Sequence, residues 1–270
     1  MKYEMENRIL PDENYNSLLA RYPIVSIFLV AGLFLLCTTW KVIFHGVTAT
    51  MFVFISLAVV GLFGMPFILG LPNGRKPLTE YMKDIRLKTE SSLFQDITIG
   101  VISAGLLLTS LILSSVITVN FYFEVDKILA EQVIESLTHG IWEEVYFRGV
   151  ILVLCIRVLR KQWLALVMAA AVFSAIHFDL DNFFRLSLIG FLWGYMTVKT
   201  NSLLPAIISH TLFNLISSAM VPEISGLEAY QWLVIWHLLI VIAVFVSIWV
   251  TNTITRWWST KEDREVPAVL

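Results

Sequence analysis

Long apolar runs alternate with short polar stretches along most of the chain. A helix needs about 20 mostly apolar residues to span the hydrocarbon core of a bilayer. By that rule the pattern predicts membrane-spanning helices at 24–44, 50–71, 93–119, 130–156, 163–179, 184–199, 203–221 and 230–252. We therefore expect an all-α fold, a polytopic membrane helical bundle of about eight transmembrane helices in which residues 1–270 form a single membrane domain. The count falls to six or seven if a segment is re-entrant.

Composition supports a membrane protein and excludes one class of partner. Charged residues make up only 15% of the chain, against about 25% in soluble domains. The net charge of -2 excludes a strongly basic nucleic-acid binder, so the expected partners are the lipid bilayer and a membrane-associated peptide or protein. Cys37 and Cys155 lie in apolar runs without CxxC spacing and are expected to be buried free thiols.

The distribution of basic residues predicts an orientation. With a cytoplasmic N-terminus and eight spans, 15 of the 19 Lys and Arg residues fall in cytoplasmic segments, as the positive-inside rule requires. The sequence therefore predicts a multi-pass protein of the cell membrane with both termini cytoplasmic. The first 23 residues lack an apolar core, so we expect no cleavable signal peptide and an uncleaved first helix that directs insertion.

One polar segment, 72–92, combines charges with apolar residues at 78, 81, 82 and 85. This helical spacing predicts a cytoplasmic amphipathic connector that lies on the membrane surface. An ordinary solvated linker helix is the alternative.

Ionisable and amide side chains interrupt three of the predicted spans. Such groups are costly at membrane depth, and they mark a functional site by default. At a rise of 1.5 Å per residue, Glu143, His177 and Asn214 lie about 20 Å from the cytoplasmic end of their helix, and His210 lies at about 14 Å. We therefore expect these four to converge near the middle of the membrane. The full set of candidate site residues is Glu143, Glu144, Arg148, His177, His210 and Asn214.

The fourth span suggests a division of labour between its two glutamates. Glu144 and Arg148 are four residues apart and can pair along one helix face. Glu143 points about 100° away, which makes it the better candidate for a chemical base. A desolvated carboxylate can take a proton from water, whereas His and Asn N–H groups can stabilise an oxyanion. No Ser or Cys stands at nucleophile spacing in these motifs, so attack by water is favoured.

Three motifs, Glu143-Glu144-x-x-x-Arg148, Phe173-x-x-x-His177 and His210-x-x-x-Asn214, resemble those of the CAAX protease and bacteriocin-processing family. The resemblance covers roughly 130–218, the expected family-like catalytic core. It implies a glutamic-type intramembrane endopeptidase, similar to the type II CAAX prenyl endopeptidases. By this analogy Glu143 and His177 activate water, His210 and Asn214 form the oxyanion site, and Glu144 and Arg148 orient the site.

Several alternatives remain open at this stage. Two histidines and a glutamate could hold Zn²⁺, but there is no HExxH and the resemblance favours catalysis without a metal, so no cofactor is expected. The family also includes bacteriocin-immunity proteins, so a non-catalytic binding role is a second candidate. A proton-coupled transporter would show internal repeats, which we do not find.

Two further patterns accompany the motifs. Glu131, Glu135 and His139 form a stripe at four-residue spacing before Glu143, which is either a solvated face or a path to Glu143. Gly190-x-x-x-Gly194 favours close helix contact over ligand binding.

Overall fold

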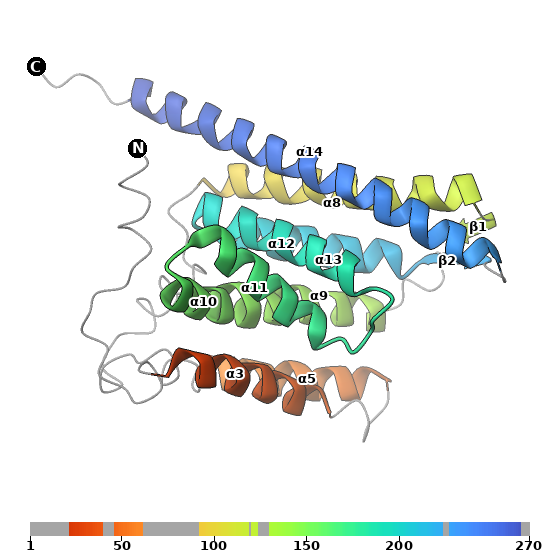
Figure 1. Ribbon diagram of the computed structural model, residues 1–270, viewed down its shortest axis with the longest axis horizontal. Helices are drawn as coiled ribbons and strands as arrows, with labels where there is room; N and C mark the ends of the chain where they lie inside the picture. Colours follow the sequence, from red (N-terminus) through yellow and green to blue (C-terminus); the bar gives the residue numbers. More distant parts are fainter. Residues whose placement is uncertain are drawn as a thin grey trace, which may run out of the picture. The chain divides into compact units, whose positions relative to one another are not determined.

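Helices account for most of the computed structural model (Figure 1), which describes residues 22–39, 46–61, 92–118, 120–123, 130–223 and 227–265. The α-helices are α3 (Pro23–Thr38), α5 (Gly46–Val59), α8 (Leu93–Thr118), α9 (Ala130–Glu144), α10 (Leu152–Leu159), α11 (Gln162–Ala175), α12 (Phe183–Thr200), α13 (Leu204–Ser217) and α14 (Leu227–Glu265). A π-helix, η4 (Val145–Ile151), joins α9 to α10. The strands β1 (Asn120–Phe123) and β2 (Met220–Glu223) complete the described elements.

The expected all-α architecture is confirmed, and each predicted apolar segment contains a helix. The fourth segment is α9, η4 and α10 in succession, and the eighth extends to Glu265. The fifth and seventh are shorter than predicted, because α11 ends at Ala175 and α13 at Ser217. Parts of 24–44 and 50–71, and all but the last residue of the connector 72–92, lie outside the described residues.

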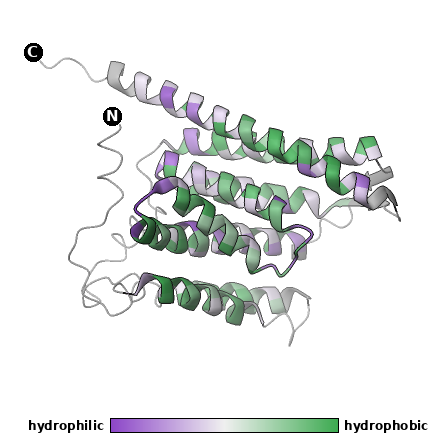
Figure 2. Ribbon diagram, in the orientation of Figure 1, coloured by the Kyte–Doolittle hydropathy of each residue, from purple (hydrophilic) through white to green (hydrophobic). Residues whose placement is uncertain are grey.

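Two helices are long and apolar enough to cross a membrane, as far as the described residues go: α8, and Tyr230–Thr260 within α14. Four shorter apolar helices lie at Pro23–Thr38, Ala49–Val59, Gln162–Ala175 and Leu204–Ser217. Figure 2 shows the apolar character along these helices and the more polar turns in the C-terminal half of α14. The number of eight spans stays a prediction.

The strands form a short antiparallel ribbon that the hydrophobic pattern did not predict. Asn120 pairs with Glu223, and Phe123 pairs with Met220. β1 follows α8 closely and β2 follows α13. The ribbon therefore connects the C-terminal ends of these two helices.

The chain divides into two compact units, with one boundary after Lys88 and the other two within α9 and α12. The first unit comprises Met1–Lys88 and Ile141–Phe191, and the second comprises Thr89–Gly140 and Leu192–Leu270. Each unit is described separately below.

Aromatic side chains form much of the core of the first unit. The Phe34 ring of α3 meets the rings of Tyr146 and Phe147 edge-on, with centroids 5.4 and 5.3 Å apart. The buried Tyr146 hydroxyl donates a hydrogen bond to the Leu57 carbonyl oxygen of α5 at 3.1 Å. Burial of a tyrosine hydroxyl requires such a partner. The π-helix is thus tied to both N-terminal helices.

In the second unit, α8 and α14 run antiparallel against each other (Figure 1). Near the start of α14, the Trp232 indole N–H donates to Ser115 Oγ near the end of α8 at 3.2 Å. Towards the other end, the Trp258 ring lies 5.8 Å from the Phe94 ring at the start of α8. Two contacts at opposite ends fix the direction of the pair.

Glycines allow α13 to approach its neighbours in the second unit. A Cβ added at Gly100 of α8 would lie 2.8 Å from both Ile208 Cβ and the Pro205 carbonyl oxygen. A Cβ added at Gly140 of α9 would overlap with Thr211 Oγ1 and lie 3.0 Å from the Thr211 backbone nitrogen. Small residues at these points permit close helix packing, as is typical of membrane helices.

Replacing Gly140 with alanine is therefore expected to force α9 and α13 apart. Overpacking of this kind costs about 1–3 kcal/mol, more than the gain in helix propensity of alanine over glycine, about 0.5–1 kcal/mol. Denaturant unfolding in detergent micelles measures the change. The matched control is Gly105→Ala on α8, where an added Cβ meets nothing within 4 Å, so stability should hold or rise. Equal effects of the two substitutions would contradict the close contact.

Candidate functional site

The first motif lies where α9 passes into the π-helix η4. Glu143 and Glu144 are the last residues of α9, and Arg148 lies within η4. The Leu152 N–H that follows η4 donates to the Phe147 carbonyl oxygen, five residues back. All seven residues of η4 are buried. π-Helical turns are rare and occur frequently at functional sites.

Glu144 and Arg148 form a buried ion pair, as their spacing predicted. Arg148 Nη1 donates to Glu144 Oε1 at 2.9 Å, and the two residues are 2% and 0% exposed. Arg148 Nη2 donates to the Gly190 carbonyl oxygen at 3.2 Å. The guanidinium carbon lies 4.2 Å from the centre of the Phe173 ring, in a cation–π contact. Hydrogen bonds on two sides and an aromatic face fix the guanidinium in place.

The helix backbone at Gly190 lies so close to its neighbours that a side chain would not fit there unless they shifted. An added Cβ would lie 3.0 Å from Phe173 Cδ1 and 3.2 Å from Arg148 Nη2. Glycine thus lets the α12 backbone accept the hydrogen bond from Arg148. This supports the interpretation of Gly190 as a helix-packing residue.

Glu143 is the second carboxylate of the motif and is also buried, with 4% of its surface exposed. It attracts the Arg148 guanidinium electrostatically, as Glu144 does. Glu144, however, makes the direct hydrogen bond at 2.9 Å. The two carboxylates therefore have different surroundings. In proteins with paired acidic residues, such differences in environment allow the two acids to have different roles.

His177 lies in a turn after α11 and is exposed, whereas the apolar pattern placed it inside a span that extends to residue 179. The helix ends early because the next residues form a tighter turn with hydrogen bonds from residue i to i-3. The His177 N–H donates to the Ser174 carbonyl oxygen, and the Phe178 N–H donates to the Ala175 carbonyl oxygen. Phe178 then adopts a φ of 52°. Bonds from residue i to i-3 are a common way to close a helix.

The His177 ring is nevertheless held in a defined orientation. Its Nδ1 lies 2.8 Å from the Phe173 carbonyl oxygen, and its ring centroid lies 4.8 Å from that of Phe173. A carbonyl oxygen only accepts hydrogen bonds, so Nδ1 carries the proton and Nε2 of the neutral ring is an acceptor. Phe173 thus contacts both His177 and Arg148 and links the first two motifs.

A hydrogen-bonded link from Asp179 to Asn182 joins α11 to α12 and appears hydrophilic in Figure 2. Asp179 Oδ1 accepts from the Asn182 N–H at 3.1 Å, and its other oxygen accepts from the Asn182 side chain. The hydrogen bond from the Asn182 side chain is the main cause that lowers the pKa of Asp179. The hydrogen bond from the Asn182 backbone and the positive charge of Arg185 lower this pKa further. This link fixes the turn that carries His177.

The third motif lies on α13 in the second unit. The buried His210 ring stacks on the Trp193 ring, with centroids 4.0 Å apart and planes 18° apart. The Trp193 indole N–H donates to Ser209 Oγ at 3.1 Å, which fixes the indole. The sequence did not single out Trp193 as the platform for His210. Trp193 lies within the Gly190-x-x-x-Gly194 pattern, which the sequence analysis interpreted only as a site of close helix contact.

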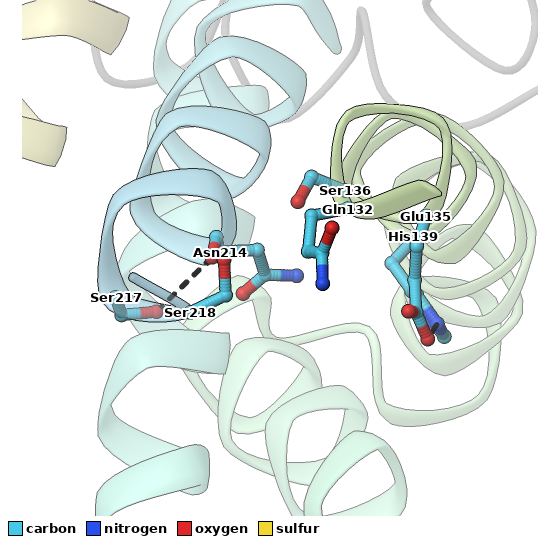
Figure 3. Close-up of a pocket in the computed structure, with 7 residues that line it drawn as sticks. All are labelled: Gln132, Glu135, Ser136, His139, Asn214, Ser217 and Ser218. Carbon is cyan, nitrogen blue, oxygen red and sulfur yellow. Dashed lines mark hydrogen bonds and ion pairs between the residues drawn. The ribbon is translucent and has the colours of Figure 1, made fainter. Parts of the chain in front are cut away.

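Asn214 faces a polar cavity between α13 and α9, also within the second unit (Figure 3). The polar residues of α9 recur every three or four positions, the helical period, and this stripe was partly predicted through Glu135 and His139. The lining residues are Gln132, Glu135, Ser136, His139, Asn214, Ser217 and Ser218.

Four candidate residues belong to the first unit, namely Glu143, Glu144, Arg148 and His177, and Phe173 links His177 to Arg148. His210 and Asn214 lie together in the second unit, one turn apart on α13. Convergence of all six stays a prediction. Among the residues that the structure describes, no three His, Cys, Asp or Glu side chains are placed to hold a metal ion.

Residues 126–216 match the sequence model of one family, described as type II CAAX prenyl endopeptidase Rce1-like. The resemblance to the CAAX protease family is confirmed. The Rce1-like match covers roughly a third of the chain and contains all three motifs. No curated protein and no solved structure matches the chain. The match to the Rce1-like family model and the apolar helices point to a membrane protein that is similar to these proteases over residues 126–216.

Proposed function

We propose that this chain is a multi-pass intramembrane endopeptidase that hydrolyses a peptide bond of a membrane-associated peptide or protein with glutamate-activated water. The observation that carries the proposal is the family match, because 126–216 includes every residue of the three motifs. In the proposed topology eight helices span the cell membrane and both termini are cytoplasmic. No cofactor takes part.

Glu143 is the general base and acts with His177. A carboxylate held next to a bound water can act as a general base towards it. Glu143 takes one proton from water as the water oxygen bonds to the carbonyl carbon of the substrate. Breakdown of the tetrahedral intermediate cleaves the carbon–nitrogen bond, and the leaving amine receives a proton through Glu143 and His177. Water and a peptide bond thus give one carboxyl and one amino terminus.

His210 and Asn214 stabilise the oxyanion. Stacking on Trp193 restricts the His210 ring to one plane, so its N–H is oriented before the charge develops. Donors arranged in advance at the oxyanion often contribute most to catalysis. The Asn214 amide, which faces the cavity, supplies the second donor.

Glu144 and Arg148 orient the site rather than react. Their ion pair, together with the Arg148 contacts to Gly190 and Phe173, fixes the end of α9 that carries Glu143. Groups that hold catalytic residues in place are as necessary as the residues themselves.

The proposal is tested by proteolysis in reconstituted liposomes, with a pool of native membrane peptides as substrate and with or without a chelator. We expect cleavage that the chelator does not affect. Loss of cleavage with chelator and recovery with Zn²⁺ would instead indicate a metalloprotease. Absence of cleavage over a broad pool would favour the non-catalytic immunity or binding role.

His210→Ala is expected to lower kcat by about 10²–10³-fold, the usual effect of removing one oxyanion donor. Asn214→Ala should have a similar effect. The matched control is His237→Ala on α14, which removes a histidine that contacts the Leu233 carbonyl oxygen and belongs to no motif. The cleavage rates of the variants are measured in the liposome assay. If His210→Ala and His237→Ala lowered kcat equally, a specific role for His210 would be refuted.

A further inference from the structure

The cavity beside Asn214 is polar in an otherwise apolar protein. Its volume of about 270 Å³ is close to the lower end for ligand sites, roughly 300–1,000 Å³. It therefore suits one or two residues of a longer ligand. Figure 3 shows the Asn214 side chain pointing from α13 towards α9, where Gln132 and Ser136 lie.

The lining offers the groups that an extended polypeptide backbone needs. Two amide side chains, Gln132 and Asn214, both donate and accept hydrogen bonds. The three serine hydroxyls can accept them, since Ser217 and Ser218 donate their own protons to the Asn214 and Leu215 carbonyl oxygens. A peptide that enters a low-dielectric region must find partners for its N–H and C=O groups. This cavity provides such partners from two facing helices.

The charge of the cavity favours a cationic group. Glu135 contributes a carboxylate with 41% of its side chain exposed, and it lies 3.6 Å from His139 Nε2. None of the seven described lining residues is Lys or Arg. The wall can therefore attract a positive charge but has no fixed cation to bind a carboxylate.

We infer that this cavity is a subsite for the substrate polypeptide beside the cleaved bond, and that Glu135 gives it a preference for a Lys or Arg side chain there. The inference rests on the proposed function, because Asn214 places the cavity next to the oxyanion. Glu135 is a specificity-determining residue and takes no part in bond cleavage. A substrate whose free C-terminal carboxylate occupies this cavity is disfavoured.

The test measures binding separately from cleavage. The probes are short Ala/Leu peptides with a fluorophore and a single central Lys, Gln or Glu. Fluorescence anisotropy gives their Kd for the full-length Glu143→Gln protein in lipid nanodiscs, in which the peptides stay intact. We expect the Lys peptide to bind about fivefold tighter than the Glu peptide, the range of a partly exposed ion pair.

Adding Glu135→Gln should abolish this preference, and Glu135→Lys should reverse it. The control is Asp181→Asn, which removes an exposed carboxylate that does not line the cavity and should leave the preference intact. A preference that survives Glu135→Gln, or Asp181→Asn acting equally, would overturn the inference. So would failure of all three peptides to bind.

The same peptides offered to the protein with Glu143 intact separate the two proposals. Cleavage with a Lys preference that Glu135→Gln removes supports both. If the peptides are cleaved but the preference among them does not depend on Glu135, the subsite is refuted and the proposed protease activity is supported. A third outcome is binding that depends on Glu135 without cleavage of these peptides or of the native pool. That result would support the cavity as a peptide-binding site and would refute the proposed hydrolytic function.

Discussion

Replacing Glu143 with glutamine is expected to lower kcat/KM by about 10²–10⁴-fold, the usual contribution of a general base. Glutamine keeps the size and hydrogen-bonding shape of glutamate but cannot take a proton from water. The rate of peptide cleavage in liposomes measures the loss. Because the substitution adds no volume and keeps the direct hydrogen bond between Glu144 and Arg148, unfolding in detergent should change less than in Glu144→Gln.

Glu144→Gln serves as the contrasting variant. It weakens the pair with Arg148 and leaves a buried guanidinium with reduced compensation, so stability should fall along with activity. If Glu144→Gln abolished cleavage without loss of stability while Glu143→Gln retained it, the roles of the two carboxylates would be exchanged.

Arg148→Met is expected to destabilise the protein by about 3–5 kcal/mol, because removing one partner of a buried ion pair leaves an uncompensated charge. The substitution also removes the hydrogen bond to the Gly190 carbonyl and the contact with the Phe173 ring. Denaturant unfolding in micelles measures the change. Arg160→Met, at an exposed position, should stay within about 0.5 kcal/mol of the wild type.

The double variant Glu144→Gln/Arg148→Met separates the ion pair from the other contacts. With both charges gone, much of the lost stability should return, since a neutral replacement of a buried pair is often tolerated. If the double variant were less stable than Arg148→Met alone, Glu144 would need a different explanation from that of a counter-ion.

Hydrophobic length and spacing were enough to predict most of the helices. α8 matches its predicted range almost to the residue, and the Glu144–Arg148 pair follows from a spacing of four. The extent of this helix and the spacing of this ion pair both depend on residues that are close in the sequence. Sequence patterns are well suited to predicting such local features. The motifs also led to the family resemblance that the comparison with family models confirms.

Helix ends and the ribbon were not predictable in the same way. Phe173 to Phe178 is mostly apolar, yet α11 ends at Ala175, because the end depends on the turn at Phe178 and on hydrogen bonds across the link to α12. α14 continues beyond its apolar part since charged residues such as Lys261 and Glu262 are good helix formers. Strands β1 and β2 pair across almost a hundred residues, a separation that no local pattern reports.

The arrangement of the site in two units also lies beyond sequence patterns. Motif spacing placed the polar residues on particular helices, but it did not indicate the Trp193 platform or the serines beside Asn214. These contacts join residues from different helices, and their side chains are common in apolar segments. Only packing distinguishes them from other serines and tryptophans.

The π-helix η4 has a consequence for comparing this chain with its relatives. Loss of a single residue from Val145–Ile151 would allow an ordinary α-helix there, with an almost unchanged hydropathy profile. A deletion between Glu144 and Arg148 would nevertheless shorten their spacing from four residues to three and so change the geometry of the ion pair. A one-residue alignment gap between Glu144 and Arg148 is therefore a clearer sign of a homologue in which this ion pair is altered than any change in predicted membrane topology.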